Sequence, residues 1–326
     1  MKVTELRKLL ANADNDLLKK TIVEVYKLVP SSKKDEADDT IMKALGCETE
    51  KPMGGISETD FNKLSEEINE FLSDAYAGYY YIPNRHIPKK ERPKWRFHIK
   101  RYVKELDKIS SDSPFYHNAT EMLISIYKLM CNGCNYYVFS STDPFKSSGI
   151  GQYELYKMFA KRVLSSQYNN DELIDLIKCS STGGLSTSSL NFSQQTVLVG
   201  QLKTSNELHI LLNLTKDLID GKIEIKGVNN KNLDSYIFED NINNLCDLAL
   251  ITQIKLGEFD DIIAYYFQNC RYYNKESTLY HGLDIISWFT DDDKDLWLKF
   301  YDYGVKKRKI KPRSDLLEEY KEKIKA

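Results

Sequence analysis

Apolar residues recur every three or four positions over most of this chain. Such spacing is typical of the buried face of an amphipathic helix. It is present within the first 45 residues and returns in the segments 57–82, 93–109, 113–137, 152–166, 171–179, 205–220, 240–255, 258–273, 277–289, 291–303 and 314–325. The pattern predicts an all-α fold. Because no motif repeats at a fixed period, we expect an irregular array of packed helical hairpins, either solenoid-like or a multi-helix bundle.

A proline and two glycines indicate a linker near the start of the chain. Pro52, Gly54 and Gly55 fall between two helical patterns, and residues of this kind interrupt helices. We therefore expect an N-terminal helical bundle over 1–45 and a larger α-helical array over 57–326. The loop at 179–193 is a candidate sub-boundary within the larger array.

Two segments break the helical pattern. The first, 179–192, is rich in Ser, Thr and Gly and predicts a flexible loop. In the second, residues 222–226 alternate between charged and apolar side chains, which is the period of a half-buried strand. Paired with 196–199, this stretch predicts one short β-hairpin near 196–226.

Composition narrows the class of protein. The 326 residues are 41% apolar with a formal net charge of -2, which excludes an intrinsically disordered chain. Only 15 Gly and 8 Pro are present, and this scarcity of turn-forming residues disfavours an all-β fold.

No apolar stretch approaches the roughly 20 residues that cross a bilayer, and the N-terminus lacks the apolar core of a secretory signal. We expect a cytoplasmic protein without membrane contact, and we expect its six cysteines to be reduced thiols.

Basic residues are concentrated in one segment. Residues 85–108 hold ten Lys or Arg against three acids, and 306–313 adds six more basic residues and no acid. A helical wheel of 93–109 predicts a core face made of Trp95, Ile99, Tyr102, Val103, Leu106 and Ile109. The opposite face gathers basic side chains around Phe97. The candidate binding residues are Arg85, Lys89, Lys90, Arg92, Lys94, Arg96, Phe97, Lys100, Arg101 and Lys104.

This basic surface has three interpretations. It predicts an acidic protein partner with Phe97 as the anchor, so that the chain is a non-catalytic scaffold for protein–protein interaction. Alternatively, it predicts non-specific binding to the phosphate backbone of a nucleic acid, with Phe97 stacked on a base. The third interpretation is a solvated helix face whose charges pair with the acidic remainder of the protein.

Two motifs have the spacing of metal ligands. Cys131 and Cys134 form a C-x-x-C, but zinc needs two more ligands and no second such pair exists. Four acids fall at positions 1, 3, 5 and 12 of a calcium loop, namely Asp291, Asp293, Asp295 and Asp302. Leu296 occupies the position that requires glycine, so these acids fit the first turn of a helix better. The sequence predicts no metal and no cofactor.

Two histidine–carboxylate pairs could act as acid and base on one helix face. They are His117 with Glu121 and His281 with Asp284. The chain contains no H-E-x-x-H, G-x-S-x-G, Walker or G-x-G-x-x-G motif. An enzyme with a helical active site is therefore the third functional hypothesis, and no residue is assigned as catalytic.

Overall fold

The computed structural model describes residues 14–30, 34, 37, 41, 56–225 and 235–325. Contacts divide the chain into two compact units, 1–57 and 58–326. In the first unit, helix α2 spans Asn15–Lys27 and is capped by Asp14, whose carboxylate accepts a hydrogen bond of 2.7 Å from the backbone N–H of Leu17. Residues 34, 37 and 41 are also helical. The remaining N-terminal residues of the predicted bundle lie outside the described part.

The second unit confirms the all-α prediction. Its described residues contain no strand. The α-helices are α4 (Glu58–Tyr76), α5 (Trp95–Asp107), α6 (Tyr116–Asn135), α7 (Pro144–Ser148), α8 (Gln152–Leu164), α9 (Asn170–Ser181), α10 (Asn191–Gln201), α11 (Ser205–Ile219), α12 (Ser235–Leu256), α13 (Phe259–Asn269), α14 (Lys275–Thr290), α15 (Lys294–Asp302) and α16 (Ser314–Lys325). A short 3₁₀ helix, η2 (Arg92–Lys94), precedes α5, and a π-helical turn, η3 (Tyr303–Lys307), follows α15.

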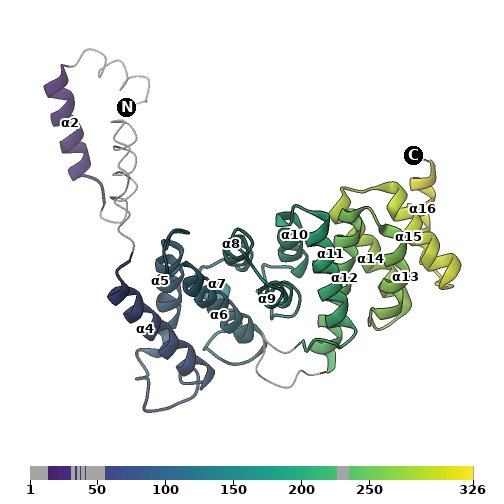
Figure 1. The fold of residues 1–326 in the computed structure, drawn as a ribbon, viewed down its shortest axis with the longest axis horizontal. Coiled ribbons are helices and arrows are strands. Elements are labelled where there is room, and N and C mark those ends of the chain that lie inside the picture. Colours follow the sequence, from purple (N-terminus) through teal and green to yellow (C-terminus); the bar gives the residue numbers. More distant parts are fainter. Residues whose placement is uncertain are drawn as a thin grey trace. The chain divides into compact units, whose positions relative to one another are not determined.

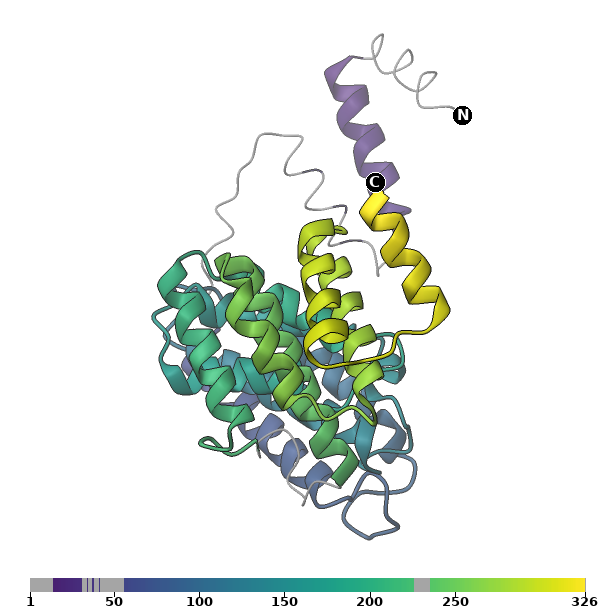
Figure 2. The ribbon, with the colours of Figure 1, turned by 90° about the vertical axis from the view of Figure 1, so that its right-hand side faces the viewer.

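The helices of the second unit pack mainly against near neighbours in the sequence. Helices α4 and α5 contact α6, which contacts α8; helices α8 and α9 contact α10. The longest of the described helices, α12, contacts helices α9, α10, α11, α13 and α14, and α15 joins α14 to α16. Figures 1 and 2 show the resulting succession from α4 to α16. This is the irregular array of packed helices that the sequence predicted.

Buried aromatic rings form much of the core. Trp95 of α5 stacks on Phe139 with ring centroids 4.1 Å apart, and Tyr127 of α6 meets Phe159 of α8 at 5.1 Å. Phe300 of α15 is also fully buried. Each such ring removes a large apolar area from water, which is the main favourable contribution to folding.

The Ser- and Thr-rich segment 179–192 is ordered by tertiary contacts, so the prediction of a flexible loop is wrong. Its first three residues complete α9, and α10 begins at Asn191. Between the helices, Ser186 is only 3% exposed. Its backbone N–H donates to Gln152 Oε1 (2.8 Å), and its hydroxyl donates to Asp143 Oδ2 (2.9 Å). Acceptors that are distant in the sequence therefore fix a segment whose composition alone indicates flexibility.

The predicted β-hairpin near 196–226 is also wrong. Residues 196–199 lie inside α10, where Leu198 and Val199 are buried. Residues 222–225 are described and form no strand, whereas 226–234 lie outside the described residues. A short apolar run is compatible with a buried helix as well as with a strand. Here the segment packs as helix α10 against α8, α9 and α12.

Among the helices that the structure describes, none combines the length and the apolar character needed to span a bilayer.

Candidate functional site

Helix α5 separates an apolar face from a basic one, as the helical wheel predicts. Its inward residues, Trp95, Ile99, Tyr102, Val103 and Leu106, are buried. On the outward side, Phe97 is 65% exposed. Positions three, four and seven residues along a helix share a side, so Lys100, Arg101 and Lys104 follow Phe97 on this surface. We call Arg96, Phe97, Lys100, Arg101 and Lys104 the basic face.

Most cations of the basic face have no acidic partner. Arg96, Lys100 and Lys104 are exposed and have no carboxylate within 4.0 Å among the residues that the structure describes. The Arg96 guanidinium lies 5.6 Å from the centroid of the Phe97 ring. Arg101 differs because it pairs with Glu67 of α4. The centre of the basic face therefore presents an aromatic ring among uncompensated positive charges.

Three further predicted residues lie in the loop 77–91, which precedes α5. Arg85, Lys89 and Lys90 are exposed there and form no ion pair in the described part of the chain. The same loop carries Tyr81, whose ring stacks on Tyr137 with centroids 5.2 Å apart, and both rings are exposed. Sequence reasoning missed this aromatic pair, because the two tyrosines are distant along the chain.

The last two predicted binding residues have partners within the protein. Arg92 Nε donates to the carbonyl of Ile87 (3.0 Å), and its Nη2 donates to the carbonyl of Asn84 (2.8 Å). Arg92 therefore fixes the loop that leads into α5. Lys94 pairs with Glu91 at 2.8 Å on the neighbouring turn. These two side chains are less available to a partner than the cations of the basic face.

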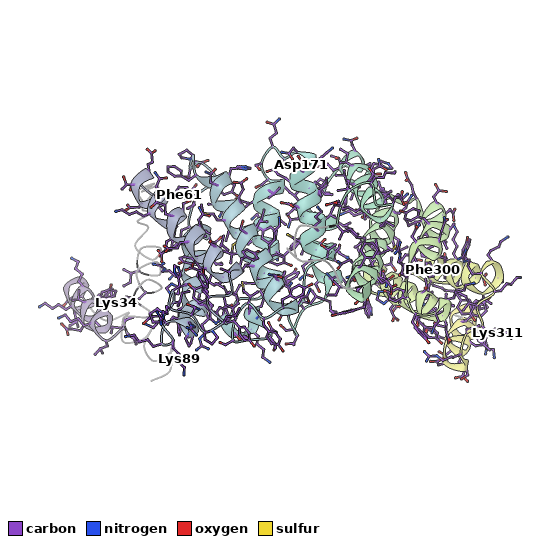
Figure 3. The ribbon with its side chains drawn as sticks, turned by 90° about the horizontal axis from the view of Figure 1, so that it is seen from below. Lys34, Phe61, Lys89, Asp171, Phe300 and Lys311 are labelled. Carbon is purple, nitrogen blue, oxygen red and sulfur yellow. The ribbon has the colours of Figure 1, made fainter. Side chains whose placement is uncertain are left out.

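The second basic segment, 306–313, does not extend this surface. Lys306 pairs with a carboxylate of α15 at 2.7 Å, and Arg308 donates to a backbone carbonyl of α13 at 3.0 Å. The segment thus belongs to the packing of the last helices. Figure 3 shows Lys89 and Lys311, one residue from each basic segment, at opposite ends of the 58–326 unit.

The C-x-x-C motif lies within a helix. Cys131 and Cys134 both belong to α6, and Cys131 is buried, with its sulfur accepting a hydrogen bond from Gln152 Nε2 at 3.4 Å. Burial raises the pKa of Cys134 to about 12. At neutral pH this thiol is therefore protonated and unreactive. No cluster of His, Cys, Asp and Glu in the described residues could hold a metal ion.

Two acids of the calcium-like motif, Asp291 and Asp293, lie where α14 ends and α15 begins. Asp293 is the N-cap of α15, and its carboxylate accepts from the backbone N–H groups of Asp295 (3.0 Å) and Leu296 (3.1 Å). Asp291 has a positive φ of 54° at the end of α14. These positions therefore form a tight connection between two helices.

His281 is paired with a carboxylate that its sequence spacing did not indicate. Its Nε2 lies 2.9 Å from Oδ2 of Asp247 on α12, and the hydroxyl of Tyr266 donates to the other oxygen at 2.8 Å. Burial by itself lowers the pKa of His281, but the hydrogen bond and charge of Asp247, with the charge of Asp284, raise it above 6.5 overall. The predicted partner, Asp284, thus contributes charge, whereas Asp247 makes the contact.

His117 lines a cavity of about 330 Å³ between α6 and α9. Its Nε2 lies 3.4 Å from Glu121, as the sequence pairing predicts, and its Nδ1 lies 3.7 Å from Glu172. Lys128 and Asp175 form a second pair at 2.9 Å in the same cavity. In the described part, no hydroxyl or thiol donates to His117, so this site has an acid–base pair without an activated nucleophile.

Comparison with protein-family models, with curated proteins and with solved structures finds no match for this chain.

Proposed function

We propose that this chain is a helical binding protein whose basic face docks an acidic segment of another protein. One observation carries the proposal: Phe97 is 65% exposed and lies among cations that have no acidic partner in the described residues. Aromatic rings and arginines of this kind anchor protein interfaces once they are desolvated. Carboxylates of a partner would supply the missing counter-charges around the ring.

The size and borders of the basic face favour a protein segment over a nucleic acid. Helix α5 has 13 residues, so the face is about 20 Å long at a rise of about 1.5 Å per residue. Acids border it, because Glu67 of α4 reaches Arg101 and also accepts from the Tyr102 hydroxyl at 3.0 Å. The second basic segment lies elsewhere in the unit, so among the described residues the two basic segments do not form one continuous track for a phosphate backbone.

A photo-crosslinking experiment tests both the surface and the class of partner. The analogue benzoylphenylalanine is placed at position 97 of the full chain, and crosslinked products are identified after nuclease treatment. We expect nuclease-resistant adducts with a protein whose crosslinked peptide is rich in Asp and Glu. A control probe at the exposed position Trp288 should give none of these adducts.

Charge reversal provides the matched variants. Replacing Arg96, Lys100 and Lys104 together by Glu should abolish the position-97 adduct, since the partner's carboxylates would then be repelled. Reversal of three other exposed lysines, Lys157, Lys161 and Lys203, makes the same change in net charge and should leave the adduct intact. Adducts with nucleic acid would overturn the proposal in favour of phosphate binding. Equal loss of the position-97 adduct in both triple variants would also overturn it, because the adduct would then depend only on the net charge of the protein.

A further inference from the structure

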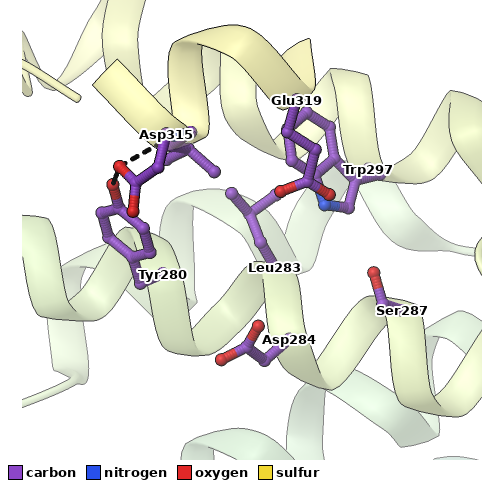
Figure 4. Close-up of a pocket in the computed structure, with 8 residues that line it drawn as sticks. Tyr280, Leu283, Asp284, Ser287, Trp297, Asp315 and Glu319 are labelled. Atoms are coloured by element: carbon purple, nitrogen blue, oxygen red, sulfur yellow. Dashed lines mark hydrogen bonds between the residues drawn. The ribbon is translucent and has the colours of Figure 1, made fainter. Parts of the chain in front are cut away.

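Helices α14, α15 and α16 enclose a small pocket of about 120 Å³ (Figure 4). Helix α16 closes one side of it and buries Leu316. The ring of Tyr320 stacks on Tyr301 with centroids 4.2 Å apart, and its hydroxyl donates to Asp302 at 3.2 Å. These contacts dock α16, so the pocket is part of the folded unit.

Three carboxylates line this pocket. Asp315 accepts from the hydroxyl of Tyr280 at 3.0 Å and lies 3.9 Å from Arg313 Nε, and Glu319 lies 3.6 Å from the ammonium of Lys323. Asp284 is exposed, and its carboxylate has neither a hydrogen bond nor an ion pair among the residues that the structure describes. Two of the three acids are therefore paired with a cation, and in the described residues the excess negative charge of the pocket comes from Asp284.

Two hydrogen-bond donors of the same pocket also lack acceptors. Trp297 is 1% exposed, and its indole nitrogen faces the pocket interior in Figure 4. Within the described part of the chain, neither this indole N–H nor the hydroxyl of Ser287 makes a hydrogen bond. Both donor atoms are accessible, so water or a ligand in the pocket can accept from them.

The chain already holds one ammonium group beside this pocket. Lys323 Nζ lies 5.1 Å from the centroid of the Trp297 ring, and its side chain is largely buried. An ammonium over an indole ring and beside a carboxylate is a favourable arrangement. The chemistry of the pocket wall therefore suits an organic cation. A directly bound metal ion is not favoured, since no group of three or more ligands in the described residues is arranged to hold one.

We propose that this pocket binds a small amino alcohol. Its ammonium group would lie between Asp284 and Glu319, and its hydroxyl oxygen would accept from the indole N–H of Trp297. This assignment gives partners to Asp284 and to Trp297 with one molecule. The volume limits the ligand, because a cavity of about 150 Å³ holds a molecule the size of benzene.

Nuclear magnetic resonance on the ¹⁵N-labelled full chain tests the proposal with 2-aminoethanol as the probe. The indole signal of Trp297 is assigned from a Trp297→Phe variant. We expect a saturable shift of this signal at millimolar concentrations. Propan-1-amine replaces the hydroxyl by a methyl group and should bind about tenfold more weakly, since it offers the indole N–H no acceptor. Sodium chloride at equal ionic strength should give no saturable shift.

Two variants separate specific binding from general attraction. Asp284→Asn should weaken 2-aminoethanol binding at least tenfold, because it removes the one pocket carboxylate that has no partner among the described residues. Asp261→Asn changes an exposed acid of α13 outside this pocket and should bind as the parent protein does. Absence of a saturable shift would show that the pocket holds only water, and equal affinity in the Asp284→Asn variant would overturn the assignment.

Discussion

The guanidinium of Arg162, on α8, donates a hydrogen bond of 2.9 Å to the backbone carbonyl of Leu106, in the last turn of α5. Its Nε donates to the hydroxyl of Thr120 at 2.9 Å, and the group lies 4.1 Å from the ring centroid of Tyr116. No carboxylate in the described residues pairs with it at 4.0 Å or less. A buried cation is therefore held by neutral acceptors, an aromatic ring and the negative end of a helix dipole.

Replacing this arginine should destabilise the junction of α5, α6 and α8. Arg162→Met removes the donor to the hydroxyl of Thr120 and the side-chain donor to the carbonyl of Leu106, which keeps only backbone donors such as the N–H of Ile109 (3.2 Å). We expect a loss of about 3 kcal/mol. Urea denaturation followed by circular dichroism measures the free energy of unfolding. Lys161→Met, at the adjacent exposed position, should change it by less than about 0.5 kcal/mol. Equal effects in the two variants would contradict this role for Arg162.

Asp143 should be required for the order of the 182–190 connection. Its Oδ2 accepts from the hydroxyl of Ser186 and from the backbone N–H of Thr187, each at 2.9 Å. Asp143→Ala removes these acceptors, so we expect a loss of about 3 kcal/mol and faster hydrogen exchange at 182–190. Asp112→Ala, in an exposed loop, is the control. Unchanged exchange in the Asp143→Ala variant would mean that packing alone orders the segment.

Two glycines should respond in opposite directions to the same substitution. A Cβ at Gly184 would overlap the backbone carbonyl of Cys131 and would lie 2.7 Å from Asn135 Oδ1. Gly184→Ala should therefore cost about 1–3 kcal/mol. At Gly200, inside α10, a Cβ meets nothing within 4 Å, and Gly200→Ala should stabilise the protein by up to about 1 kcal/mol. Thermal unfolding of both variants checks the predicted signs.

The His281–Asp247 pair should make stability depend on pH. Because the pKa of His281 in the folded protein lies above its ordinary value of 6.5, the folded state binds the proton more tightly than the unfolded state. This contribution is fully present below about pH 6.5 and is lost as pH rises through the raised pKa. The stability of the parent protein relative to His281→Gln should therefore fall as pH rises. Urea unfolding of both proteins at pH 5.5 and at pH 8.5 measures this difference, and a constant difference would contradict the assignment.

The local pattern of apolar and polar residues was sufficient to predict much of the architecture. The inward and outward sides of α5 follow from helical periodicity, because residues three and four apart share a face whatever the helix packs against. The exposure of Phe97 could be predicted for the same reason. The contact between His117 and Glu121 also follows from spacing, since both belong to one helix.

Features that depend on contacts between residues distant in the sequence could not be predicted from the local pattern. The composition of 182–190 indicates a mobile loop, yet acceptors on Asp143 and Gln152 bury and order it. The choice of Asp247 over Asp284 as the contact of His281 depends on how α12 packs on α14. The same holds for the pocket under α16, whose walls come from three helices.

The sequence by itself determined that this chain is helical and that α5 carries a basic face around Phe97, because both properties follow from the local period of the helix. Only the tertiary structure decided which charges have partners. Arg92 and Arg101 are held by neighbouring segments, whereas Arg96, Lys100 and Lys104 meet no carboxylate in the described residues. The physical reason is that an ion pair forms within about 4 Å in space, and packing brings side chains to that distance irrespective of their separation along the chain.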